Sequence, residues 1–240
     1  MAADANDVAE RVAALPWAEL RRQLDARGFA HSSGLLSAAE CRALSALYPD
    51  AARFRSKIIM ERHGFGRGEY QYFGEPLPPL VQSLRESLYA ELAPIASSWA
   101  EQLKSDQRFP ETLAEFREQC RAQSQVRPTP LLLRYGPGDY NCLHQDLYGD
   151  IVFPLQVAVL LNEPGEEFTG GEFVLTEQRP RMQSRVHVVP LRRGDAVVFA
   201  VRERPVAGKR GFHRVNMRHG VSPLASGARL TLGVIFHDAL

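Results

Sequence analysis

The sequence predicts a mainly β protein, a barrel or jelly roll braced by helices, forming one integrated domain of 240 residues. Two observations predict this class. After Pro130, short apolar segments alternate with Gly and Pro turn residues, and no helical segment separates them. Before residue 125, apolar residues recur every three or four positions, which is typical of helices. We therefore expect a helical support region over 1–125 and a β core over 126–240.

The N-terminal half contains three predicted helices. One covers 17–28 and ends at a glycine, and the next begins with the capping box Ser37-x-x-Glu40. The third is a long helix whose apolar stripe runs from Leu80 to Trp99, and Pro94 would kink it. These helices are expected to brace the sheet.

A glycine-rich, aromatic segment over 58–73 shows little helical period. It predicts either a strand pair or a loop that covers a site and its substrate. Its aromatic residues Phe65, Tyr70 and Tyr72 are candidates for stacking on a base.

The C-terminal half contains six predicted strands, LLLRYG, PLQVAVLLN, GGEFVLT, RVHVVPL, GDAVVFA and RLTLGVIF. Glycine and proline steps such as Gly136-Pro137-Gly138 and Gly170-Gly171 mark the corners between them. Spacing of this kind favours a barrel or jelly roll over a βαβ sheet.

Composition limits the class of protein further. With 45% hydrophobic and 24% charged residues, the chain can bury one substantial core. Cys41, Cys120 and Cys142 show no Cys-x-x-Cys spacing, so neither a disulfide framework nor a zinc knuckle is indicated. The sequence has neither a leader pattern nor a long apolar span, so we expect a cytoplasmic protein with no membrane partner.

A candidate metal site consists of His144 and Asp146, in a His-x-Asp pair, and His219. Residues i and i+2 of a strand point to the same side, so the pair can aim at the barrel interior. Two imidazoles and one carboxylate on one face of Fe(II) leave the opposite face open for a co-substrate and O2. These three residues are the predicted metal ligands and catalytic residues.

Arg229 begins the final predicted strand, on the same face as Thr231. A buried arginine requires an anionic partner, and the sequence offers no obvious acid neighbour. The distal carboxylate of 2-oxoglutarate would fit its planar fork, and Tyr135 would donate a hydrogen bond to the same carboxylate. Arg229, Thr231 and Tyr135 are therefore the predicted co-substrate residues.

From Leu131 onward the chain resembles the 2-oxoglutarate Fe(II) dioxygenase superfamily, whose double-stranded β-helix carries His-x-Asp, a distal His and an Arg about ten residues beyond it. The segments most similar to prolyl-hydroxylase-like members are 135–146, Leu161-Asn162, Gly170-Gly171-Glu172, Arg193-Gly194-Asp195 and RLTLGVIFHD. More narrowly, the chain resembles a bacterial family associated with oxidation of damaged nucleic acid. The resemblance implies that His144, Asp146 and His219 bind iron and that Arg229, assisted by Tyr135, anchors 2-oxoglutarate.

Basic residues are concentrated between Gln178 and Arg218, where eleven Lys or Arg face only Asp195 and Glu203. This +9 segment predicts either a positive face for nucleic acid or ordinary solvation. His213, in an expected loop with Arg210 and Arg214, is a candidate substrate contact or a solvated side chain.

Three further residues have simpler expectations. His187 and His237 are expected to be structural or surface residues rather than ligands. Cys142 shares strand parity with His144 and would lie near the iron or, more commonly, be a small buried thiol.

Three functions agree with these features. The first is an oxygenase that hydroxylates or oxidatively demethylates a C–H bond on alkylated nucleic acid. The second is a prolyl or peptidyl side-chain hydroxylase. The third is a non-catalytic metal- or ligand-binding jelly-roll module, against which the intact ligand set argues.

Overall fold

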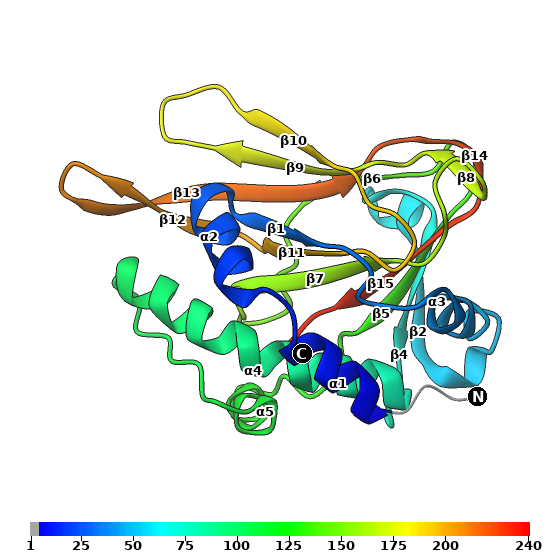
Figure 1. The fold of residues 1–240 in the computed structure, drawn as a ribbon, viewed down its shortest axis with the longest axis horizontal. Helices are drawn as coiled ribbons and strands as arrows, with labels where there is room; N and C mark the ends of the chain where they lie inside the picture. The colour runs from blue at the N-terminus through cyan, green and yellow to red at the C-terminus, as the bar shows by residue number, and fades with distance from the viewer. Residues whose placement is uncertain (1–4) are drawn as a thin grey trace.

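The computed structural model describes residues 5–240, which form three layers (Figure 1). A smaller sheet lies on one side of a larger one, and α1, α4 and α5 cover the other side. The helices are α1 (Ala5–Ala13), α2 (Trp17–Arg27), α3 (Ala38–Ser45), α4 (Pro79–Gln102) and α5 (Leu113–Ala122), with 3-10 turns η1 (Ala51–Arg53) and η2 (Met60–His63).

The larger sheet has seven strands in the order β1-β11-β7-β15-β5-β4-β2. Their bounds are β1 Phe29–Ser32, β2 Phe54–Ile59, β4 Glu69–Phe73, β5 Leu131–Tyr135, β7 Leu155–Leu160, β11 Ala196–Ala200 and β15 Arg229–Val234. Each named strand pair in it is antiparallel.

The smaller sheet has six strands in the order β10-β9-β13-β6-β3, with β12 paired to β13. Their bounds are β3 Gly66–Arg67, β6 Tyr140–His144, β9 Phe173–Gln178, β10 Arg185–Val189, β12 Glu203–Gly208 and β13 Gly211–Val221. A separate antiparallel pair joins β8 (Phe168–Gly170) to β14 (Leu224–Gly227).

The central strands of the larger sheet are buried on both faces, because helices cover one face and the smaller sheet covers the other. Every residue of β7, β11 and β15 is buried. Val157 and Leu232 belong to the core shared with α4, whereas Ala158 belongs to the core shared with the smaller sheet. This two-residue alternation places Arg229 and Thr231 on the inner face, between the sheets.

The predicted helices are confirmed. The α2 helix ends at Gly28, which adopts a left-handed conformation (φ 79°) and donates its N–H to the Leu24 carbonyl. Ser37 and Glu40 form the capping box of α3. Pro94 lies inside α4 without ending it.

The N-terminal half is only partly helical, because it also supplies four strands. The β1 strand pairs with β11, β4 pairs with β5, and β3 pairs with β6, so strands from this half extend both sheets. The 58–73 segment forms part of the β2–β4 pair together with η2 and β3. The expected strand pair is therefore present in this segment.

A buried ion pair attaches the segment after β15 to α4. Arg85, fully buried, donates to the carbonyls of Ile235 and Phe236 and, at 2.7 Å, to Asp238. Arg117 of α5 pairs with the second oxygen of Asp238 at 2.9 Å. Within the described residues, no helix has the length and apolar character needed to cross a membrane.

Candidate active site

The three predicted metal ligands lie together between the sheets. His144, at the end of β6, is directly opposite His219 of β13, and Asp146 follows in the loop after β6. The two Asp146 oxygens lie 3.3 Å from Nε2 of His144 and 3.3 Å from Nε2 of His219. One donor atom from each residue falls within 4.8 Å of the others, so the group could hold a metal ion.

Neighbouring groups orient these side chains. The Nδ1 of His144 lies 2.8 Å from the Cys142 carbonyl, which leaves Nε2 directed toward Asp146. The Tyr148 hydroxyl donates to Asp146 Oδ1 at 2.9 Å. The buried Nδ1 of His219 has no protein partner.

Burial and mutual contact set the charges of the triad. Burial opposes ionisation of Asp146, but the two imidazoles outweigh it and hold the pKa of Asp146 well below its usual value. Burial lowers the pKa of His144, yet contact with Asp146 raises it overall. Burial and the charge of His144 lower the pKa of His219. An ionised Asp146 beside a neutral His219 imidazole matches what metal binding requires.

Arg229 lies on the inner face of the larger sheet, as the sequence predicts. It is 2% exposed, and its Nη1 donates to Thr231 Oγ1 at 2.6 Å. Its Nε has no partner, and within the described part of the chain no carboxylate forms an ion pair with it. Burial lowers its pKa, partly offset at longer range by Tyr135 and Glu172. A buried cation without an ion pair could bind a diffusible anion.

Tyr135 lies opposite Arg229 in the register of β5 and β15. Its buried ring is 5.6 Å from the Arg229 guanidinium carbon, and its hydroxyl accepts from Asn141 at 3.4 Å. Burial raises the pKa of Tyr135, so the phenol stays protonated and can donate. Gly171 is needed beside them, because it has φ +66° and a Cβ there would lie 3.1 Å from Arg229 Cδ.

One cavity of about 440 Å³ joins the triad to Arg229, Thr231 and Tyr135. Both sheets wall it, with apolar contributions from Leu133, Ala158 and Phe199. Its size falls in the range of small-molecule sites. This largely apolar cavity could therefore hold a metal ion and a small dicarboxylate together.

Two of the three candidate stacking residues line this cavity. Phe65, 47% exposed, and Tyr70 are among its walls. Tyr72 instead is buried and packs edge-on against Tyr148. The expectation of a buried Cys142 is wrong, because this thiol is exposed and lines the same cavity.

Two further polar residues, Tyr148 and Gln156, belong to this site and are not among those predicted from the sequence. Tyr148 is two positions after Asp146, so its parity with the metal ligands was an available signal. Gln156 is the lone polar residue of β7, and its buried amide oxygen has no protein partner where it lines the cavity. A single amide in an apolar strand was the signal for it.

The basic segment 178–218 is divided among several environments. Arg204 is buried and pairs with Glu177 at 2.6 Å, and Arg193 pairs with Glu167. Most of the others lie on the β9–β10 and β12–β13 hairpins, which project from the same end of the molecule (Figure 1). His213 lies exposed on β13, paired with Val206, so the expected loop is a hairpin strand.

His187 and His237 have structural roles. His187 of β10 packs against the Phe29 ring at 5.2 Å. His237 is fully buried and accepts the Phe153 N–H on Nδ1 at 3.3 Å, so a surface position is excluded.

Comparison with known proteins matches most of the chain to one family. A model of the Oxygenase-NA family, described as oxygenases catalysing oxidative methylation of damaged DNA, matches residues 68–239. Uncharacterized proteins from two strains of Mycobacterium tuberculosis are 46% identical over 193 residues, covering 79% of this chain and 83% of each relative.

Solved structures with much lower identity share the fold. A prolyl-4-hydroxylase from Pseudomonas putida is 19% identical with a TM-score of 0.54, covering 90% of this chain and 96% of that protein. An oxidoreductase of the 2OG-Fe(II) oxygenase family from Burkholderia pseudomallei is 15% identical with a TM-score of 0.56, covering 93% of this chain and 92% of that protein.

Proposed function

The chain belongs to the Oxygenase-NA family, and from this premise we propose a specific activity of the 2-oxoglutarate/Fe(II) oxygenase type. It is an Fe(II)- and 2-oxoglutarate-dependent dioxygenase that oxidises a C–H bond of an alkylated nucleotide in nucleic acid. The observation that carries the co-substrate assignment is Arg229, a buried cation with no ion pair in the same cavity as a His-Asp-His group.

In this proposal the fold is a double-stranded β-helix. Strands β5, β7, β11 and β15 form its larger face, and β6, β9, β10 and β13 form its smaller face. Residues 126–240 are the catalytic core, and 1–125 support it with helices and additional strands.

The donor set fits the proposed cofactors. The Nε2 atoms of His144 and His219 and a carboxylate oxygen of Asp146 would hold Fe(II), and Arg229 would bind the distal carboxylate of 2-oxoglutarate. When bound, this pair supplies the oxidation of a substrate C–H bond by O2, with 2-oxoglutarate converted to succinate and CO2.

Residues of the chain fix the charge and orientation of the groups in the cavity and exclude water from it. Asp146 remains ionised because the imidazoles stabilise its charge, and Tyr148 fixes its orientation through Oδ1. Thr231 fixes the Arg229 guanidinium, and the Tyr135 phenol is available to donate to the same anion. Apolar walls such as Phe199 exclude water, which strengthens each of these polar contacts.

The nucleic-acid substrate is supported by three features. The family description names damaged DNA. Phe65 and Tyr70 line the cavity, where an extruded base could stack. The basic hairpins lie on the same smaller sheet as His219 and offer cations to a phosphate backbone.

Succinate release tests the proposal. Protein loaded with Fe(II) and 2-oxoglutarate should release succinate faster with methylated oligonucleotides than with unmethylated ones or with proline-containing peptides. Stimulation by peptides alone would replace the nucleic-acid substrate with the peptidyl-hydroxylase alternative. Binding of metal and 2-oxoglutarate without any succinate would favour the non-catalytic module.

A further inference from the structure

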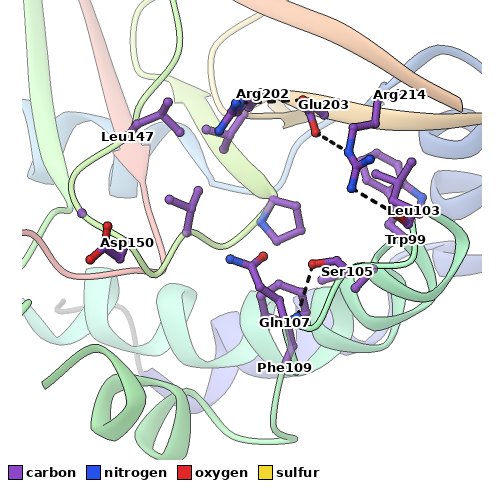
Figure 2. Close-up of a pocket in the computed structure, with 16 residues that line it drawn as sticks. Trp99, Leu103, Ser105, Gln107, Phe109, Leu147, Asp150, Arg202, Glu203 and Arg214 are labelled. Carbon is purple, nitrogen blue, oxygen red and sulfur yellow. Dashed lines mark hydrogen bonds and ion pairs between the residues drawn. The ribbon is translucent and has the colours of Figure 1, made fainter. Parts of the chain in front are cut away.

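A second cavity of about 320 Å³ lies beside the metal-binding loop (Figure 2). It is bounded by the C-terminal end of α4, the segment after that helix, residues 147–154 and the start of β12. Leu147 lines both this cavity and the one that contains the triad. The two cavities are therefore neighbours that share Leu147 as a wall.

Gln145 connects the two cavities structurally. It lies between His144 and Asp146, and its Nε2 donates to the Met217 carbonyl at 2.8 Å and to the Arg202 carbonyl at 3.3 Å. The His-x-Asp segment is thus bonded on its other side to the strand segment that walls the second cavity. These two hydrogen bonds fix the position of the His-x-Asp segment relative to the wall of the second cavity.

The second cavity combines an apolar surface with two arginines, Arg202 and Arg214. Phe109 and Leu103 are among its apolar lining residues. Arg214 already uses two of its donors, because its Nε contacts Glu203 at 3.0 Å and its Nη2 donates to the Leu103 carbonyl at 3.0 Å. Figure 2 shows these two contacts beside the cavity.

Arg202 is the other arginine that lines this cavity, and among the described residues its side chain makes no hydrogen bond. Its side chain is 58% exposed, and its nearest carboxylate oxygen, on Glu203, is 3.8 Å from Nε, beyond hydrogen-bond distance. Asp150 lies at the opposite end of the cavity from Arg214 (Figure 2) and would repel an anion there. Glu203 is a second carboxylate in the lining, so an anionic group in this cavity is favoured only where it contacts the Arg202 guanidinium directly.

We propose that this second cavity is the subsite for the nucleotide adjacent to the one that is oxidised. Its phosphate binds Arg202, and its base or sugar packs on the apolar surface near Phe109. A neutral peptide unit would leave the guanidinium without its anion, so the chemistry favours a nucleotide. This inference rests on the proposed nucleic-acid activity and adds where the substrate's next unit is held.

The test compares a methylated trinucleotide with the matching methylated mononucleotide by binding titration at several salt concentrations. The Arg202→Gln variant should lower the ratio of trinucleotide to mononucleotide affinity by about 5- to 10-fold. Loss of one single-strand phosphate contact should also reduce the log–log salt slope by about 0.7. Arg202→Lys should retain most of the salt slope, because it keeps the charge.

Arg121→Gln provides a matched control, since Arg121 is an exposed arginine of α5 that pairs with Glu118 and lines neither cavity. Equal affinity ratios and salt slopes for wild type and Arg202→Gln would overturn the subsite. That result differs from failure of the proposed function, in which wild-type protein itself shows no succinate release with any methylated oligonucleotide. Such an outcome would overturn both proposals together.

Discussion

Arg229 allows a prediction in which stability and ligand affinity respond differently to one substitution. The guanidinium is 2% exposed, bonds to Thr231 and leaves Nε without a partner. Replacing it with methionine removes a buried cation and keeps a similar apolar volume. We expect the unfolding free energy of the ligand-free protein to rise, or to fall by less than about 1 kcal/mol, because an uncompensated charge no longer has to be desolvated.

The same substitution should remove most of the affinity for 2-oxoglutarate. A hydrogen bond to a charged group contributes about 1.5–3 kcal/mol, so a two-bond fork contributes at least about 3 kcal/mol. That value corresponds to a dissociation constant at least about 100-fold weaker. Arg229→Lys should restore only part of it, because an ammonium cannot form the fork.

Thermal or chemical unfolding of Mn(II)-loaded protein without O2 measures both effects. At a 2-oxoglutarate concentration about 100 times the wild-type Kd, the ligand should stabilise wild type by about 2.7 kcal/mol. At that concentration Arg229→Met should gain only about 0.4 kcal/mol, since the ligand is then near its Kd. Arg134→Met is the control. Arg134 precedes Tyr135 on β5, but its side chain is 55% exposed, so the same substitution removes a charge outside the cavity.

The opposite pair of results would refute a co-substrate role for Arg229. If Arg229→Met lost more than about 2 kcal/mol of stability and kept the wild-type response to 2-oxoglutarate, the arginine would be a structural group satisfied by Thr231.

Three other predictions concern the metal, the fold and pH. His144→Ala or Asp146→Ala should abolish metal binding in a titration with Mn(II), because two remaining ligands cannot hold a labile ion. Succinate release should be lost as well. Metal binding or succinate release at the wild-type level in either variant would contradict the site. Asp238→Asn should cost about 3–5 kcal/mol in denaturant unfolding, since it leaves buried Arg85 without its counter-ion, and a loss below about 1 kcal/mol would contradict that role. Burial lowers the pKa of His237 to about 4, so the unfolded chain, with a histidine pKa of about 6.5, takes up the proton first. The unfolding free energy of metal-free protein should therefore fall by about 3 kcal/mol as pH drops from about 6.5 to 4, and His237→Asn should flatten that interval.

The parts of the site that could be predicted depend on local spacing. Two-residue alternation along a strand places Thr231 beside Arg229, and the structure keeps this arrangement. A capping box and a glycine stop involve neighbours within a few positions, and so the end of α2 and the start of α3 could be predicted.

The parts that could not be predicted depend on partners distant in the sequence. The β1 strand has only four residues and no period of its own, and its pairing of Phe29 with Phe199 defines it. The exposure of Cys142 and the burial of His237 are decided by which segments cover them. The second cavity brings α4, the metal-binding loop and β12 together, and none of these segments carries a motif for it.

The position of β15 has a consequence for how the protein is made. This strand lies between β7 and β5 in the larger sheet, yet it follows both of them in the sequence. During synthesis on the ribosome, β5 and β7 therefore emerge with their inner edges unpaired, and these edges can pair with other chains until β15 inserts. A chain interrupted before Arg229 would lack both the co-substrate arginine and the strand that closes the sheet. Premature termination there should yield aggregates rather than an inactive folded enzyme.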